Sequence, residues 1–347
     1  MKPLISVCVP VFNSEPYLER ALDSILSQSF DKNFETVIVN DGSSGLDCNG
    51  DNCDRIVKRF KKQFKGRTIY IKHDKNKGLL EARRSAIEAA RSEYVTILDS
   101  DDQLLPDCLS VLYECAVKNN ADIVHGGAGI YFEEADSTGI SLSEEKINGL
   151  KKHWEERAMN IHEGVLNGRE VLQNLLIDRG HKGLLWAKLF RRETYLEALN
   201  HIPPMNCTYL EDVLQYTFIA YHAKVYYGIK KPVYKYTLGT GVSAGRTIDN
   251  LDKWKVRCAA AGVFAVLQTE AKQIPDFDQD KRYLVEIAKT THGYLYTLII
   301  DLNHLVLPEL RPAARDMLCE YWGADFVKKM EEQYEKNKTT GSTVLSL

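Results

Sequence analysis

Short apolar runs alternate with longer amphipathic stretches along the first third of the chain. The apolar runs are rich in β-branched residues and predict buried strands. After the first run, Leu18, Leu22 and Ile25 recur at helical spacing behind Ser14, a residue type that caps helices. A strand, a helix and a second strand at this spacing form a parallel βαβ unit. The predicted strands are residues 4–10, 35–40, 68–73, 94–98 and 122–125, with an extension of the last strand to residue 132 left open.

The second half of the chain has a different pattern. Residues 137–160 are polar and predict a surface excursion, whereas 184–190 and 233–236 are short apolar segments. From about residue 249 onward the pattern is helical, with an end from about 333 that is expected to fray. The predicted helices there are 254–271, 281–302 and 308–322. We therefore expect an α/β domain over residues 1–246, with a mostly parallel sheet flanked by helices, and a small all-helical region over 247–347.

Composition narrows the class of protein. The chain has 347 residues, of which 44% are hydrophobic and 27% charged, as in ordinary soluble globular proteins. A net charge of −3 gives no general attraction to nucleic acid or to anionic lipid. No apolar run is long enough to span a bilayer, and no secretory segment is expected. The expectation is a cytoplasmic protein, with peripheral contact at the inner face of the cytoplasmic membrane left open.

The strongest chemical signal follows the predicted strand at 94–98. Asp99, Asp101 and Asp102 place three carboxylates within four residues. Like charges about 4 Å apart repel by roughly 4 kcal/mol at an effective dielectric of 20, so solvent or a cation must relieve them. Mg²⁺ or Mn²⁺ would do so and would bridge to substrate phosphates. The competing interpretation is a solvated acidic turn before the next helix.

Other polar residues are expected at the same sheet edge. The ends of the first two predicted strands, 10–13 and 40–43, lie on the edge that carries the acidic cluster. Arg83 is near the start of a helix and could reach an anion there, although a lone Arg is usually solvated. Glu211 and Asp212 begin another apolar helix, where acids commonly complement the helix dipole.

Some segments leave alternatives open. The glycines at 126–129 lack the full dinucleotide-binding pattern. The Gly- and Ser-rich stretch 239–246, ending in Arg246, fits either a mobile lid on a phosphate or a linker. Cys48 and Cys53 flank a polar loop and could pair, but two cysteines cannot complete a zinc site. The remaining cysteines are expected to be reduced core thiols.

Taken together, the segments resemble the family 2 glycosyltransferases of the GT-A fold. The resemblance covers roughly residues 4–246 and rests on the order and approximate spacing of several short motifs. The C-terminal helices lie outside it. The loop at 45–54 is longer and more Cys-rich than the family pattern, and the Gly-rich stretch replaces an Arg-containing one. The motifs are residues 6–13, 38–44, 76–78 with 82–83, 98–102, 186–190 and 211–212.

The resemblance implies a nucleotide-sugar site in the half of the domain over about 1–132 and an acceptor half over about 133–246. Pro10, Val11, Phe12 and Asn13 would lie along a uridine base, and Asp41 would accept a hydrogen bond from it.

The remaining implied roles concern the sugar, the metal and the acceptor. Asn76 and Arg83 would contact the ribose and diphosphate; Asp99 and Ser100 would face the ribose and sugar; Asp101, supported by Asp102, would hold Mn²⁺ or Mg²⁺; Asp212 would be the catalytic base; and Trp186, Lys188 and Glu211 would line the acceptor side.

The resulting hypothesis is an inverting, metal-dependent glycosyltransferase that uses a UDP-sugar, acts on a glycan or lipid-linked saccharide, and serves bacterial surface polysaccharide synthesis. The transferred sugar is expected to be a hexose or an N-acetylhexosamine. Two alternatives remain at this stage. A nucleotidyltransferase would need a basic, Gly-rich loop after the first strand, which residues 11–16 do not provide. A catalytically silent nucleotide-binding module could instead act in assembly through its helices, which could also form a homo-oligomer.

Overall fold

The strand β1 (Ile5–Val11) is buried along its whole length. It pairs in parallel with β2 (Phe34–Asn40) on one side and with β4 (Tyr94–Ile97) on the other. A strand with neighbours on both sides and both faces covered carries a nearly continuous apolar run, as this one does. The carboxyl ends of the three strands meet at one edge, which confirms the predicted parallel arrangement.

The structure is a computed structural model that describes residues 2–133, 143–240 and 247–340, apart from the side chains at 276, 278 and 340. Its packing separates two units. The first comprises residues 1–206 and 215–244, and the second comprises 207–214 and 245–347. Arg246 and most of the stretch predicted as a lid or linker lie outside the described residues.

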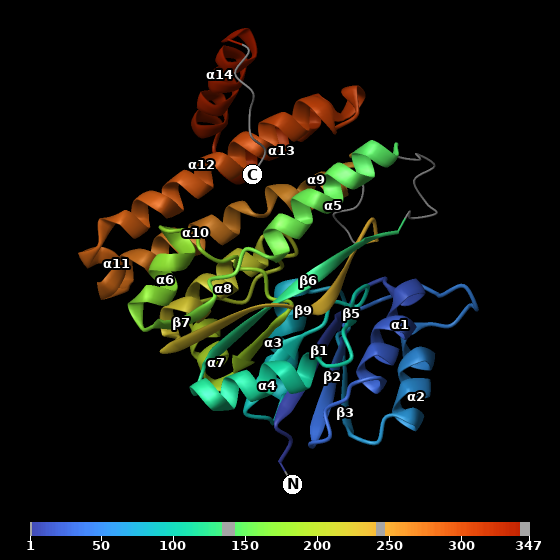
Figure 1. Cartoon of the computed structure of the whole chain (residues 1–347). Helices are drawn as coiled ribbons and strands as arrows, with labels where there is room; N and C mark the ends of the chain where they lie inside the picture. The colour runs from blue at the N-terminus through green and yellow to red at the C-terminus, as the bar shows by residue number, and fades with distance from the viewer. Residues whose placement is uncertain (1, 134–142, 241–246, 341–347) are drawn as a thin grey trace. The chain divides into compact units, whose positions relative to one another are not determined.

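The first unit contains a nine-stranded mixed sheet in the order β3-β2-β1-β4-β8-β6-β9-β5, with β7 paired to β9 (Figure 1). The strands β1 to β4 run parallel, whereas β5, β7 and β8 add antiparallel neighbours. This confirms the predicted α/β class. The remaining strands are β3 (Arg67–Lys72), β5 (Gln103–Leu104), β6 (Ile123–Phe132), β7 (Gly164–Asn167), β8 (Lys188–Arg191) and β9 (Val225–Leu238).

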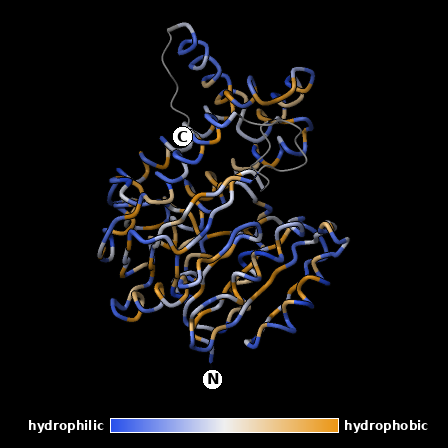
Figure 2. Tube along the Cα trace, turned by 45° about the vertical axis from the view of Figure 1, so that its right-hand side comes forward, coloured by the Kyte–Doolittle hydropathy of each residue, from blue (hydrophilic) through white to orange (hydrophobic). Residues whose placement is uncertain are grey.

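Helices connect these strands and pack on the sheet. Apolar residues of α1, α2 and α4 join those of the central strands in one hydrophobic core. Along the helices, hydrophobic and hydrophilic positions alternate, as Figure 2 shows by colour. The helices that begin in this part of the chain are α1 (Glu15–Leu26), α2 (Cys53–Gln63), α3 (Leu79–Ala89), α4 (Cys108–Asn119), α5 (Glu144–Ala158), α6 (Arg169–Leu176), α7 (Arg192–Leu199) and α8 (Glu211–His222).

The second unit is helical in its described residues, as predicted, but two details differ. The helix expected over 254–271 is broken at Ala259 and Ala260, and the end expected to fray from 333 is helical to residue 340. Within the described ranges, no helix is long and apolar enough to cross a membrane. The elements are α9 (Leu251–Cys258), α10 (Ala261–Gln273), α11 (Pro275–Gln279), α12 (Lys281–His304), a short 3₁₀ turn (Pro308–Leu310), α13 (Arg311–Trp322) and α14 (Ala324–Thr340).

The turn after β2 depends on Gly42. Its φ is +74°, and a Cβ at this position would lie 2.7 Å from the backbone nitrogen of Asn76. The loop after β3 therefore approaches the loop after β2 closely enough that a side chain is excluded. This close approach brings the predicted donor-side residues Asp41 and Asn76 to the same part of the sheet edge.

We predict that Gly42→Ala destabilises the fold by roughly 2–4 kcal/mol, because it adds both backbone strain and a clash with neighbouring backbone. Gly50→Ala is the matched control, since Gly50 has a φ of +75° but open space around its Cβ position. The control should cost only about 1–2 kcal/mol, the strain alone. Urea unfolding measures both variants. Equal losses would show that the close approach of the two loops contributes nothing.

Candidate active site

The acidic cluster begins two residues after β4, at the edge where β1 and β2 also end. The structure keeps Asp99, Asp101 and Asp102 together but gives each carboxylate different surroundings. Asp99 accepts a hydrogen bond at 2.9 Å from the guanidinium of Arg83, which is itself 3% exposed. This ion pair between α3 and the end of β4 was not predicted, and the contact of Arg83 with a diphosphate stays a prediction.

Asp102 is held by β9. Its Oδ1 accepts a hydrogen bond from the backbone N–H of Thr237 at 2.7 Å, and its Oδ2 accepts one from the Tyr234 hydroxyl at 2.9 Å. The same hydroxyl accepts a hydrogen bond from the backbone N–H of Asp99. Burial and the neighbouring carboxylates raise the pKa of Asp102 well above its usual range. As placed here, Asp102 fastens β9 to the cluster, and its contact with a metal stays a prediction.

Asp101 is bonded to Thr240, which follows β9, and to Arg20 of α1. Its Oδ2 accepts a hydrogen bond from the Thr240 hydroxyl at 3.0 Å, and Arg20 donates to its backbone carbonyl. Burial and repulsion by Asp99 raise the pKa of Asp101 to about 6, although Thr240 and Arg20 oppose that shift. A carboxylate in this state gains free energy from a nearby cation.

The donor set suits a hard divalent ion, although no group of three His, Cys, Asp or Glu side chains within the described ranges forms a protein-only metal site. Mg²⁺ is usually held by one or two carboxylates, with waters and substrate phosphates completing its coordination. A partly buried carboxylate that is repelled by a neighbour, such as Asp101 beside Asp99, fits that pattern. The predicted metal contact of Asp101 therefore has a physical basis and remains a prediction.

The loop after β1 is shaped by Asn13. This residue has a φ of +50°, and its side-chain oxygen accepts hydrogen bonds from the backbone N–H groups of Ser44 and Gly45. The amide thus joins the ends of β1 and β2. Pro10 and Val11 are buried in β1, whereas Phe12 is 40% exposed and presents its ring at this edge.

Two more predicted residues help to build the edge. The hydroxyl of Ser100 lies 2.6 Å from that of Ser14, which ties the acidic cluster to the start of α1. Asp41 is 1% exposed and accepts hydrogen bonds from the backbone N–H groups of Lys77 and Gly78 at 2.9 Å. Its Oδ1 also lies 2.5 Å from Nδ1 of His73. Asp41 therefore organises the start of α3, and its contact with a base stays a prediction.

The predicted acceptor residues Trp186 and Lys188 are largely buried. Trp186 is 6% exposed and stacks on Tyr234 and Tyr236, with ring centroids 5.4 and 5.1 Å away. Lys188 has no exposed surface, and its Nζ donates to the carbonyl of Leu184 at 2.5 Å. In this structure both side chains face protein, so an acceptor could meet Lys188 only after rearrangement.

Glu211 and Asp212 form the start of α8, as predicted, and Glu211 is buried. They belong to residues 207–214, which pack with the helical unit, whereas α8 from Gln215 onward belongs to the first unit. Asp212 accepts a hydrogen bond from the backbone N–H of Val213 at 2.8 Å. Sequence spacing did not reveal this division of the helix between the two units.

Sequence reasoning also missed Tyr234 and Thr237. The segment 233–236 was recognised only as a short apolar run, whereas β9 extends from Val225 to Leu238. Alternation along a strand does place Tyr234 and Tyr236 on one face, and this was the available signal. No signal in the sequence indicated that Tyr234 and Thr237 bond to an acidic residue more than 130 residues earlier.

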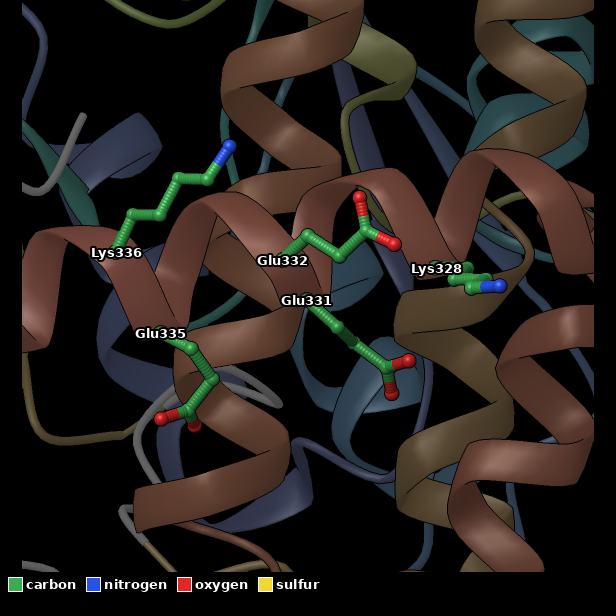
Figure 3. A pocket seen from close by; sticks show the side chains of 5 residues that line it. All are labelled: Lys328, Glu331, Glu332, Glu335 and Lys336. Atoms are coloured by element: carbon green, nitrogen blue, oxygen red, sulfur yellow. The ribbon is translucent and has the colours of Figure 1, made fainter.

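A pocket on α14 offers a contrast with the sheet edge. Five charged residues of this one helix line it, and their side chains diverge, with Lys336 pointing away from Glu331 and Glu335 (Figure 3). Glu331 also pairs with Arg315 of α13. A diverging set of both charge signs is typical of a solvated helix face. Its lining residues are Lys328, Glu331, Glu332, Glu335 and Lys336.

Comparison with known proteins agrees with the chemistry of the sheet edge. The model of glycosyl transferase family 2 matches residues 6–176, a stretch that includes the acidic cluster and the ends of β1, β2 and β4. Over these residues the chain belongs to glycosyl transferase family 2. Over 136 residues it is 40% identical to the glycosyltransferase GlyA of Streptococcus pneumoniae, and this match covers 39% of this chain and 18% of that protein. It is 30% identical over 200 residues to an uncharacterized glycosyltransferase, MJ1057, of Methanocaldococcus jannaschii, covering 56% of this chain and 63% of that protein.

These matches span less than two thirds of each relative's length. Solved structures show the same fold over more of the chain. TarS residues 1–349 of S. aureus, in complex with UDP, superpose with a TM-score of 0.52 at 20% identity, covering 96% of this chain and 92% of that chain. The mannosyltransferase PcManGT of Pyrobaculum calidifontis, in complex with GDP-Man and Mn²⁺, gives 0.52 at 17% identity, covering 97% and 81%. The predicted GT-A fold with a helical C-terminal region is confirmed.

The raised pKa of Asp101 predicts the pH dependence of stability. A carboxyl with a pKa of about 6 in the folded protein stabilises the fold below its unfolded value of about 3.9 and loses that contribution as pH rises through 6. Asp101→Asn should therefore unfold at a higher urea concentration than wild type at about pH 8, with the difference shrinking toward about pH 4.

Asp54→Asn is the control of opposite sign, because hydrogen bonds from Lys72 and Tyr70 lower the pKa of Asp54. This substitution should destabilise the protein at neutral pH and become neutral at acidic pH. Unfolding curves at several pH values measure both variants. A stability gain in Asp101→Asn that is the same at every pH would contradict charge repulsion at Asp101.

Proposed function

We propose that the protein is an inverting, metal-dependent glycosyltransferase that moves a sugar from a UDP-sugar to a hydroxyl of a glycan or lipid-linked acceptor. The observation that carries this proposal is the acidic cluster at the end of β4. There, Asp99 pairs with Arg83, while burial and mutual repulsion raise the pKa values of both Asp101 and Asp102, an arrangement that favours a bound cation. Family membership and TarS structures in complex with UDP and with UDP-GlcNAc support the donor class.

In this proposal the donor lies along the carboxyl ends of β1, β2 and β4. The exposed ring of Phe12 offers a surface for the base, while Pro10, Val11 and Asn13 shape the backbone beneath it. Asp41 and the loop at Asn76 form the second wall, which Gly42 allows to approach closely.

Charge placement decides the roles at the diphosphate. Asp101 would hold the Mn²⁺ or Mg²⁺, with Asp102 behind it. When bound there, the metal would supply positive charge against the charge that develops on a departing nucleoside diphosphate. Arg83 neutralises Asp99, so the carboxylate can orient toward sugar and ribose hydroxyls while adding less repulsion toward the phosphates.

We assign the catalytic base to Asp212. A sugar hydroxyl attacks efficiently only when a positioned base takes its proton, and an aspartate at the start of a helix keeps a fixed backbone position. A single base and direct displacement imply inversion at the anomeric carbon. Glu211, beside it, would contribute to the acceptor side, together with Trp186. A role in bacterial surface polysaccharide synthesis, at the inner face of the cytoplasmic membrane, agrees with this chemistry and remains part of the proposal.

Two substitutions should separate binding from transfer. Asp212→Asn should lower release of UDP from UDP-sugars by about 100-fold or more, because it removes the proton acceptor. Its affinity for UDP with Mn²⁺ should stay within about twofold of wild type, since Asp212 does not hold the nucleotide. Asp101→Asn should instead lose most of the Mn²⁺-dependent part of UDP affinity.

UDP release from UDP-glucose, UDP-galactose and UDP-N-acetylglucosamine is the activity measurement, and calorimetry gives the affinities. Asp316→Asn, an aspartate on α13, is a matched control that should change neither quantity. Wild-type turnover in Asp212→Asn would refute the base assignment. Undiminished Mn²⁺-dependent UDP affinity in Asp101→Asn would refute its role at the metal.

A further inference from the structure

Residues 207–214 connect two parts of the first unit along the chain, yet they pack with the helical unit. The segment runs from Cys207 to Leu214 and carries Tyr209, Glu211 and Asp212. The contacts of Tyr209 within the helical unit therefore bear on this segment.

Arg257 and Tyr294 hold Tyr209. The guanidinium carbon of Arg257 lies 5.4 Å from the centre of the Tyr209 ring, a distance typical of a cation–π contact. The Tyr294 ring lies 6.0 Å from the Tyr209 ring and tilts by 43°. Tyr294 also donates a hydrogen bond from its hydroxyl to the carbonyl of Arg257 at 3.3 Å. The ring of Tyr209 thus contacts one residue of α9 and one residue of α12.

Both residues are fixed by the interior of the helical unit. Arg257 forms an ion pair with Asp301 at 2.6 Å, and the two side chains are 14% and 12% exposed. Tyr294 packs against Phe264 and Trp322, with ring centroids 5.7 and 5.9 Å away. A partly buried arginine with a carboxylate partner keeps its orientation, since breaking the pair would leave a buried charge.

The backbone before the Glu-Asp pair needs such support. Leu210 has a φ of +61°, a conformation that costs roughly 1–2 kcal/mol for a residue with a Cβ. Strain of this kind persists only where the surroundings hold the backbone in place. Cys207, which is 1% exposed, bonds through its Sγ to the carbonyl of Tyr209 at 3.4 Å. This contact closes a local turn between Cys207 and Tyr209.

Electrostatics link the anchor to the acidic pair. Burial is the main cause that raises the pKa of Tyr209, and the charges of Asp301, Asp212 and Glu211 raise it further, whereas Arg257 lowers it. The Arg257 guanidinium and the carboxylates of Glu211 and Asp212 therefore all influence the pKa of Tyr209, and all three residues belong to the helical unit.

We propose that Arg257 is a positioning residue for transfer: through Tyr209 it fixes the segment 207–214 and so places Asp212 for proton abstraction. Within the helical unit, Tyr294 and Asp301 hold Arg257 in turn. This inference rests on the proposed function, in which Asp212 is the base. Arg257 itself acts only through the segment.

The test compares Arg257→Met with Arg257→Lys, because methionine removes the charge and lysine retains it. We expect Arg257→Met to raise the alkylation rate of Cys207, followed by peptide mass spectrometry with N-ethylmaleimide, by about tenfold or more as the segment opens. UDP release from UDP-N-acetylglucosamine should fall by about tenfold, while the affinity for UDP with Mn²⁺ stays within about twofold. Arg257→Lys should restore much of the protection of Cys207 and much of the UDP release.

Controls separate local opening from unfolding. Cys108 is fully buried in the first unit and should stay protected in every variant. Arg315→Gln removes another arginine of the helical unit, one paired with Glu331, and should change neither Cys207 labelling nor turnover. If Cys108 also becomes labelled in Arg257→Met, Tyr209→Leu provides the same readouts from the segment's side of the contact.

The outcomes distinguish this inference from the proposed function. Unchanged Cys207 protection and turnover in a folded Arg257→Met or Tyr209→Leu protein would overturn the positioning role, even if Asp212→Asn is inactive. Faster Cys207 labelling together with unchanged turnover would also overturn it, because the segment would then move without effect on transfer. An active Asp212→Asn protein would instead remove the base assignment on which the inference rests.

Discussion

Repulsion among three carboxylates at the end of β4 is the constraint around which this fold is arranged. The fold compensates Asp99 with Arg83 from α3 and Asp102 with Tyr234 and Thr237 from β9. Burial and mutual repulsion still raise the pKa values of both Asp101 and Asp102. These contacts join the end of β4 to α3 and to β9, and they form a site that favours a cation. Such polar contacts cost stability when incomplete, which is why strained or repelled groups concentrate at functional sites.

The helical unit has a larger part in this account than its place at the end of the chain suggests. Its described residues contain no metal-binding cluster, and the pocket on α14 has the charge pattern of a solvated face. Yet the segment that bears Glu211 and Asp212 packs with it, through Tyr209 and Arg257. A substitution at Arg257 is therefore expected to act on transfer through this segment alone.

The sequence was most informative where local periodicity and strand ends decide the structure. The parallel strands and the edge with Asp41, Asp99 and Asp101 followed from βαβ spacing, and the structure confirmed that arrangement. Two-residue β5 and the added strand β7 carry too little pattern to be found. The engagement of Asp102 with Tyr234, the burial of Lys188 and the packing of 207–214 depend on contacts between distant segments, which spacing does not encode. The helix break at 259–260 was missed because alanines favour helix.

The central claim, a metal-assisted site for a uridine nucleotide at the edge of the sheet, is tested most directly by calorimetry on the wild-type protein. UDP, GDP, CDP and NAD would each be titrated with Mn²⁺ and with a chelator. The account predicts that UDP binds best and that chelation weakens its binding by about tenfold or more, since the metal joins Asp101 to the diphosphate. Equal UDP affinity with and without metal, or no binding of any nucleotide, would contradict it.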